Sequence, residues 1–180
     1  MVYIILGEGF EEIEAAAPCD ILRRGGEQVL FATSGASRAV RGSHGITFLA
    51  DILTNDIVPA SGDTFVIPGG MGGVRSITSD DKTMKLLETA AASSAFLAAI
   101  CAGPSVLAKL GLTDGKRITC YPGCENMMGK ALCDTKNPVL LDGSILTGRA
   151  AGSAIDFGLA LLVHLKGEKT AEKVRADLVY

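Results

Sequence analysis

The sequence contains no tryptophan, and aromatic residues make up only 5% of it. Its interior must therefore be built mainly from alanine, valine, isoleucine and leucine, within an apolar content of 48% and beside 22 glycines. Such a composition suits helices packed closely against both faces of a sheet. The 180 residues are enough for one domain with a sizeable core, so we expect a single domain spanning 1–180.

The chain also lacks an excess of positive charge and a long apolar run. Its net charge is −3, so no basic face is expected for nucleic acid or an anionic membrane. The longest apolar stretch, FGLALLVHL, is too short to span a bilayer. The first residues, MVYIIL, carry no basic leader or cleavage site, so we expect a cytoplasmic protein.

The five cysteines form neither a disulfide framework nor a zinc site. Their number is odd, and reduced thiols are expected in a cytosol. Cys120, Cys124 and Cys133 follow a C-x3-C-x8-C spacing, without a paired CxxC or a nearby histidine. We therefore expect no bound metal and no cofactor.

Apolar runs alternate with helical segments along the chain. The expected strands are 2–6, 28–33, 63–70, 95–101 and 116–120, with hairpins at 39–50 and 138–148. The expected helices are 11–24, broken or restarted at Pro18, and 80–93, 102–111 and 152–167. This alternation predicts an α/β fold: a flavodoxin-like three-layer sandwich with a mostly parallel central sheet.

Two glycine-rich loops do not indicate nucleotide binding. The GEG at 7–9 is not completed to G-x-G-x-x-G, because position 12 is glutamate, and the neighbouring acidic residues would repel a pyrophosphate. The GGMGG at 69–73 is more typical of a tight strand-to-helix turn, and no Walker-type Gly-Lys-Ser/Thr is present.

Cys101 ends a buried strand and is followed by Ala-Gly-Pro at the start of a helix. This pattern is typical of a nucleophile elbow, which exposes the side chain at the carboxyl edge of the sheet. The helix N-terminus offers free N–H groups and a positive dipole, so we predict a nucleophilic thiol with a depressed pKa. The alternative is an inert core thiol.

Glu14 lies in an acidic segment directly after the first strand. Its neighbours are Ile13 and three alanines, so we expect its side chain to point inward, where burial would keep a carboxyl protonated to higher pH. We expect Glu11 and Glu12 to be solvated. The alternative for all of these carboxylates is an ordinary acidic first helical turn.

Four segments, LGEGFEEIEAAAPCDILRRGG, FVIPGG, AAICAGP and ILTGRAAGSAIDFGLALL, resemble in order and spacing the DJ-1/ThiJ/PfpI superfamily, most closely its branch with parkinsonism-associated DJ-1 and bacterial YajL. The resemblance implies a flavodoxin-like homodimer with Cys101 as nucleophile and Glu14 as its acid/base partner. It also implies a pocket for an oxyanion or an oxidised thiol, formed by Gly69, Gly70 and Ala102.

Two positions depart from the family pattern. Tyr121 replaces a histidine before proline, and a phenol is a hydrogen-bond donor at neutral pH rather than a base. We therefore expect Tyr121 to orient substrate. His44 replaces an arginine that reaches the dimer partner, and we expect its turn to approach the partner's Glu14 helix.

The residues favour one of the functions found in the superfamily over the others. A peptidase of this type needs a histidine directly after the cysteine, where this chain has Ala102. A glutamine amidotransferase needs a late catalytic histidine, but His164 lies within an apolar helix. The remaining hypothesis is glyoxalase III-like or deglycase-like chemistry on small 2-oxoaldehydes such as methylglyoxal. The alternative is a non-enzymatic redox sensor or chaperone that uses oxidation of Cys101.

Overall fold

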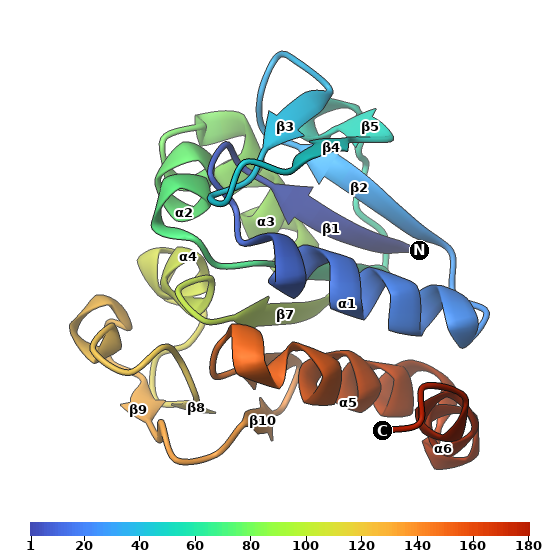
Figure 1. Ribbon diagram of the computed structural model, residues 1–180. Helices are drawn as coiled ribbons and strands as arrows, with labels where there is room; N and C mark the ends of the chain where they lie inside the picture. Colours follow the sequence, from blue (N-terminus) through green and yellow to red (C-terminus); the bar gives the residue numbers. More distant parts are fainter.

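The computed structural model describes residues 1–180, and a seven-stranded sheet forms its middle layer (Figure 1). The strand order is β10-β11-β7-β6-β1-β2-β5, and every neighbouring pair is parallel except β10 and β11. Its strands are β1 (Val2–Leu6), β2 (Val29–Thr33), β5 (Ile52–Leu53), β6 (Thr64–Ile67), β7 (Phe96–Ile100), β10 (Val139–Asp142) and β11 (Ile145–Gly148). The mostly parallel α/β sheet predicted from the sequence is confirmed.

Helices cover both faces of this sheet (Figure 1). One layer contains α1 (Glu12–Arg24), α5 (Ala154–Lys166) and α6 (Glu168–Asp177). The other contains α2 (Met71–Thr78), α3 (Asp81–Ala92) and α4 (Pro104–Lys109). Successive residues of β1 alternate between two hydrophobic cores: Ile4 packs with α1 and α5, and Ile5 packs with α3 and α4. None of these helices is long and apolar enough to cross a membrane.

Smaller elements complete the chain. The expected hairpin at 39–50 is β3 (Ala39–Arg41) paired with β4 (Thr47–Leu49), and the hairpin at 138–148 is β10 with β11. The strand expected at 116–120 is shorter, because only β8 (Arg117–Ile118) forms, and it pairs with β9 (Leu132–Cys133) outside the main sheet. Three single 3-10 turns are η1 (Thr54–Asp56), η2 (Glu125–Met127) and η3 (Ala151–Ser153).

Helix α1 does not break at Pro18, which corrects the sequence-based expectation. The helix continues to Arg24 although proline removes the N–H that would bond to the carbonyl of residue 14. Pro18 is buried against α5, where a Cβ on Gly158 would lie only 3.1 Å from its Cα. This close helix packing stabilises α1 across the proline, and it fixes the helical turn that carries Glu14.

Candidate active site

Cys101 stands at a sharp turn between β7 and α4. It is one of only three non-glycine residues with a positive φ, at 64°. Its N–H donates to the carbonyl of Gly148 at 2.9 Å, and its own carbonyl accepts from the N–H of Tyr121 at 2.9 Å. Left-handed backbone of this kind costs about 1–2 kcal/mol for an ordinary residue, so the hydrogen bonds on both sides hold the thiol in place. This is the elbow expected from the sequence.

Glu14 lies beside this cysteine in the interior. Its side chain is fully buried, and its Oε2 accepts a hydrogen bond from the N–H of Gly69 at 2.7 Å. A Cβ on Gly69 would lie 2.7 Å from that oxygen and 2.8 Å from the Cβ of Cys101. Only the backbone of a glycine therefore fits between the carboxyl of Glu14 and Cys101. The other oxygen, Oε1, is buried without a hydrogen-bond partner.

Burial changes the acidity of both groups, and the charge of Glu14 acts further on Cys101. Burial raises the pKa of Glu14 to about 7, against the opposing effects of Cys101 and the N–H of Gly69. Burial, followed by the charge of Glu14, raises the pKa of the Cys101 thiol, and the N–H of Ala102 lowers it only partly. The depressed thiol pKa expected from the sequence is therefore wrong. Helix α4 is only six residues long, and its dipole does not outweigh desolvation beside a carboxylate.

The thiol faces a cavity of about 260 Å³. Two backbone N–H groups at its wall, those of Gly70 and Ala102, donate to no backbone carbonyl. Tyr121, half exposed, forms part of the rim and is held through its own backbone rather than through its hydroxyl. The complete lining is Glu11, Gly70, Met71, Cys101, Ala102, Tyr121 and Cys124. A group that develops negative charge next to the thiol would find these free donors.

Three residues of this lining were not expected from the sequence. The sequence predicts a solvated Glu11, places Met71 in a glycine-rich turn, and offers Cys124 only as a metal ligand, whereas all three line the cavity. The loop after β8 brings Cys124 to the site, and no local sequence pattern predicts the path of that loop. The one sequence feature that could have placed Cys124 at the site is its position three residues after Tyr121, a predicted site residue.

Glu12 differs from expectation, and it contacts His44. Glu12 is buried, not solvated, and its Oε1 accepts from the N–H groups of His44 at 2.8 Å and Ile46 at 3.2 Å. Burial alone would raise the pKa of Glu12, but these hydrogen bonds lower it to about 2. The His44 ring contacts Glu12 of its own chain, with Nδ1 3.1 Å from Oε2. Within its own chain His44 therefore lies beside Glu12, and its approach to a partner's Glu14 helix remains a prediction.

Glu11, Glu12 and His44 also form the one group whose ligand atoms are close enough for a metal, within 4.8 Å of one another. Glu12 already uses its oxygens to accept hydrogen bonds from the hairpin turn. These hydrogen bonds give Glu12 a structural role in holding the hairpin turn. The absence of a metal remains a prediction.

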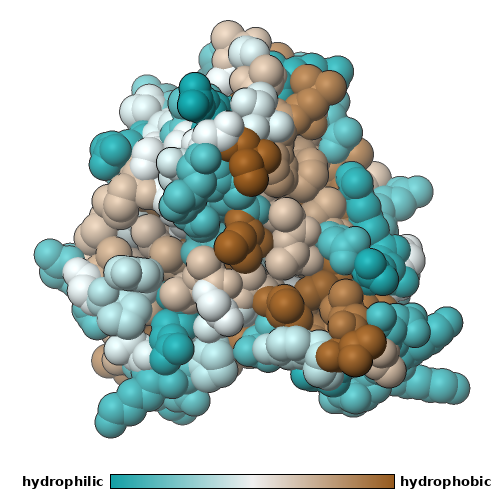
Figure 2. Space-filling model, viewed as in Figure 1, coloured by the Kyte–Doolittle hydropathy of each residue, from teal (hydrophilic) through white to brown (hydrophobic).

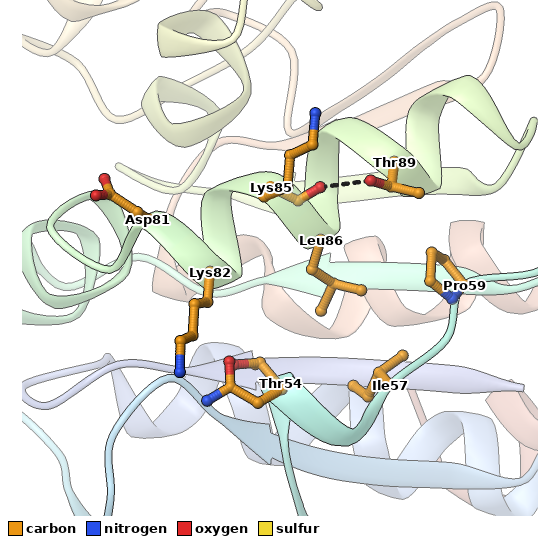
Figure 3. Close-up of a pocket in the computed structure, with 9 residues that line it drawn as sticks. Thr54, Ile57, Pro59, Asp81, Lys82, Lys85, Leu86 and Thr89 are labelled. Carbon is orange, nitrogen blue, oxygen red and sulfur yellow. Dashed lines mark hydrogen bonds between the residues drawn. The ribbon is translucent and has the colours of Figure 1, made fainter.

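A larger cavity of about 510 Å³ lies away from these groups, between α3 and the segment around η1 (Figure 3). Figure 3 shows Lys82 directed toward the η1 side, whereas Lys85 points away from it. Its lining contains no cysteine, and none of the buried side-chain atoms that lack a hydrogen-bond partner belongs to it. The reactive groups lie at the smaller cavity.

A family model decides the relationship, because the DJ-1/PfpI family model matches residues 1–164. The chain belongs to the DJ-1/PfpI family. As a member of this family, the chain has the flavodoxin-like fold seen in structures such as that of Drosophila melanogaster DJ-1beta. That crystal structure superimposes with a TM-score of 0.89 at 31% identity, covering 99% of this chain and 96% of the other.

Among characterised members of the DJ-1/PfpI family, protein dj-1beta of Drosophila melanogaster is 33% identical over 98% of this chain and 95% of its own length. "Glutathione-independent glyoxalase DJR-1.2" of Caenorhabditis elegans is 33% identical, covering 91% of this chain and 87% of that protein. "Deglycase PYRAB04690" of Pyrococcus abyssi is 30% identical, with 84% and 90% covered. Some relatives are longer: the chain spans 41% of the Arabidopsis thaliana protein DJ-1 homolog B, at 33% identity over 99% of this chain.

Proposed function

We propose that this chain is a cofactor-independent enzyme that converts small 2-oxoaldehydes, such as methylglyoxal, into hydroxy acids. The observation that carries the proposal is the burial of Glu14 beside Cys101 at a small cavity with free N–H donors. The names of two relatives, a glutathione-independent glyoxalase and a deglycase, support the same class of reaction. A cavity of about 260 Å³ suits a substrate of a few heavy atoms better than a peptide.

In the first step, the sulfur of Cys101 attacks the aldehyde carbon while Glu14 takes the thiol proton. A base with a pKa of about 7 is half ionised at neutral pH, which is close to the optimum for general-base catalysis. The thiol does not need to be ionised in the resting enzyme, because the proton transfer accompanies the attack. The N–H groups of Gly70 and Ala102 stabilise the oxyanion of the resulting hemithioacetal.

In the second step, Glu14 first returns the thiol proton to the hemithioacetal oxyanion, which makes the carboxyl a base again. Glu14 then moves a proton between the two adjacent carbons. Removal of the former aldehyde proton, protonation of the former ketone carbon, and transfer of the hydroxyl proton to the former ketone oxygen convert the hemithioacetal into a 2-hydroxy thioester. Water then hydrolyses the thioester, releasing lactate from methylglyoxal and regenerating the thiol. Each step is served by Cys101, Glu14 and backbone amides, so it requires no metal, glutathione or nucleotide.

A redox sensor or redox-regulated chaperone is the second candidate. Cys101 lines the cavity and is partly exposed, so peroxide could reach it. The same N–H groups that would stabilise an oxyanion would also stabilise a sulfinate. Turnover in the reduced state distinguishes the two candidates.

The test is conversion of methylglyoxal by the reduced protein in the absence of glutathione, with the product identified as lactate by NMR. We expect lactate from the wild-type chain and none above background from Cys101→Ser. A reduced wild-type protein that forms no lactate would contradict the enzyme proposal and favour the sensor. Cys19→Ser, which changes a buried thiol outside the cavity, is the matched control.

We further propose that the chain is a homodimer. The hairpin β3–β4 and the first turn of α1 expose large apolar side chains: Ile13, Ile46 and Leu49 are 55%, 57% and 72% exposed. Figure 2 shows separate hydrophobic side chains on the face that carries these elements. A second copy would cover them. The single domain of 1–180 and a cytoplasmic location likewise remain proposals from the sequence.

A further inference from the structure

A second thiol, that of Cys124, lines the same cavity as the Cys101 thiol. The reaction proposed above does not use it. Cys124 is partly exposed, so it is available to small molecules that enter the cavity. Of the remaining cysteines, none lines this cavity.

The backbone links Cys124 to the nucleophile by two successive hydrogen bonds. The N–H of Tyr121 donates to the carbonyl of Cys101 at 2.9 Å, and the N–H of Cys124 donates to the carbonyl of Tyr121 at 2.9 Å. Between them, Gly123 adopts a φ of 100°, which turns the chain back toward the site. Cys124 is thus held beside the elbow although it lies 23 positions further along the chain.

The side chain of Cys124 also lies at a junction between two parts of the core. It packs against the cluster that contains Ala102 and against a small cluster of Ile118, Cys120 and Met128. It belongs to a turn rather than to a helix or strand. Such a segment can adjust to disulfide geometry more readily than a residue within a regular element.

We propose that Cys124 is a resolving thiol for Cys101. A hydroperoxide oxidises the Cys101 sulfur to a sulfenic acid, and its O–O bond is reduced to give an alcohol or water. The Cys124 sulfur then attacks the sulfenic sulfur, an S–S bond forms, the S–O bond breaks, and the thiol proton leaves with the oxygen as water. The inference rests on the reactive thiol of the proposed function but not on its aldehyde substrate.

This step protects the nucleophile from irreversible oxidation. A sulfenic acid that meets a second peroxide becomes a sulfinic acid, which ordinary thiols do not reduce. A neighbouring thiol intercepts it as a disulfide, which a dithiol reductant reverses. Burial and then the charge of Glu125 raise the pKa of Cys124, so the thiol keeps its proton until it attacks.

The experiment exposes reduced wild-type protein to hydrogen peroxide, blocks free thiols with N-ethylmaleimide, and maps peptides by mass spectrometry. We expect a peptide pair that joins Cys101 to Cys124, with loss of two hydrogen atoms, which dithiothreitol separates. In Cys124→Ser that pair is lost, and Cys101 gains two oxygen atoms as sulfinate. Cys133→Ser, a matched control of similar burial in the same region, should still form the Cys101–Cys124 pair.

Three results would overturn the proposal: sulfinate forming equally fast in wild type and Cys124→Ser, peroxide linking Cys120 to Cys133 instead, or Cys101 not reacting. Cys124→Ala should behave like Cys124→Ser, and circular dichroism checks that both variants are folded. Lactate formation is measured separately on the untreated protein. A disulfide without lactate formation would contradict the enzyme proposal alone, and lactate formation without the disulfide would contradict this inference alone.

Discussion

Glu14 and Cys101 are two acids that lie side by side, Glu14 fully buried and Cys101 partly. Glu14 makes ionisation of the thiol more costly, whereas Cys101 lowers the pKa of Glu14. Burial dominates for both groups, and the charge of Glu14 adds to it for the thiol. The first proton lost near neutral pH therefore comes from Glu14, with a pKa of about 7. The sequence indicated a buried Glu14 but not this effect on Cys101, because the distance between the two side chains depends on the fold.

The raised pKa of Glu14 predicts a pH-dependent cost in stability. The folded pKa of about 7 lies above the ordinary value of 4.5, so Glu14 favours the native state most below about pH 4.5, and this contribution is lost as the pH rises to about 7. A shift of this size corresponds to about 3 kcal/mol. Glu14→Gln cannot ionise, so its unfolding free energy relative to wild type should rise by about that amount between pH 4.5 and pH 8.

Urea unfolding at both pH values measures this difference. Glu88→Gln, which changes a glutamate on the exposed surface of α3, is the control and should show no such trend. If the difference in unfolding free energy between Glu14→Gln and wild type were the same at both pH values, Glu14 would have an ordinary pKa in the folded protein.

Tyr121 is expected to orient substrate rather than to transfer a proton. Its backbone N–H binds Cys101, and its half-exposed side chain lies at the rim of the cavity. Tyr121→Phe keeps the backbone contact and removes one hydroxyl, which should lower kcat/KM by at most about tenfold. Steady-state kinetics with methylglyoxal measures this, and a thousandfold loss would make the phenol part of the proton transfer.

At the level of helices and strands, the β3–β4 hairpin is fastened to α1 by Glu12. The carboxylate accepts from two backbone N–H groups of the turn, and a Cβ on Gly42 would overlap the Glu12 side chain. The hairpin itself was evident from the sequence, with its glycine-rich turn between two apolar runs. The contact between the hairpin and Glu12 was not evident from the sequence, because an acidic residue in a first helical turn has the same local pattern whether it is solvated or buried.

Glu12→Gln should therefore destabilise the fold by about 1–3 kcal/mol at neutral pH, since hydrogen bonds to an ionised group are lost. The pKa of Glu12 is lowered to about 2, so its contribution is full above about pH 4.5 and declines as the pH falls toward 2. Urea unfolding at a series of pH values should show the difference from wild type shrinking toward pH 2. A difference that did not depend on pH would point to packing rather than charge.

Helix α6 shows where sequence patterns were insufficient. It buries only Ala171 and Val174, so it lacks the apolar stripe that marked the other helices. Conversely, residues 116–120 had a strand-like composition, but the preceding loop carries them outside the main sheet. Strong apolar periodicity predicted the central strands correctly, whereas polar or short elements depend on tertiary contacts.

At the level of the whole molecule, we expect the chain to form a homodimer. Ile46 and Leu49 are exposed on the hairpin, where an isologous contact would bury them. Sedimentation equilibrium at micromolar concentration should give twice the 18.6 kDa of one chain. Leu49→Asp should shift the mass to that of a monomer, and Val58→Asp, at a still more exposed valine outside the hairpin, should not.

The most direct test of the site is the effect of Glu14→Gln on methylglyoxal turnover. Glutamine retains the shape of the side chain and an oxygen that accepts the Gly69 N–H, but it cannot take or return a proton. We predict that kcat falls by about 10²–10⁴, the usual effect of losing a general acid/base, while Glu11→Gln at the cavity wall has a far smaller effect. Equal losses from the two variants, or an unchanged kcat in Glu14→Gln, would contradict the pairing of Glu14 with Cys101.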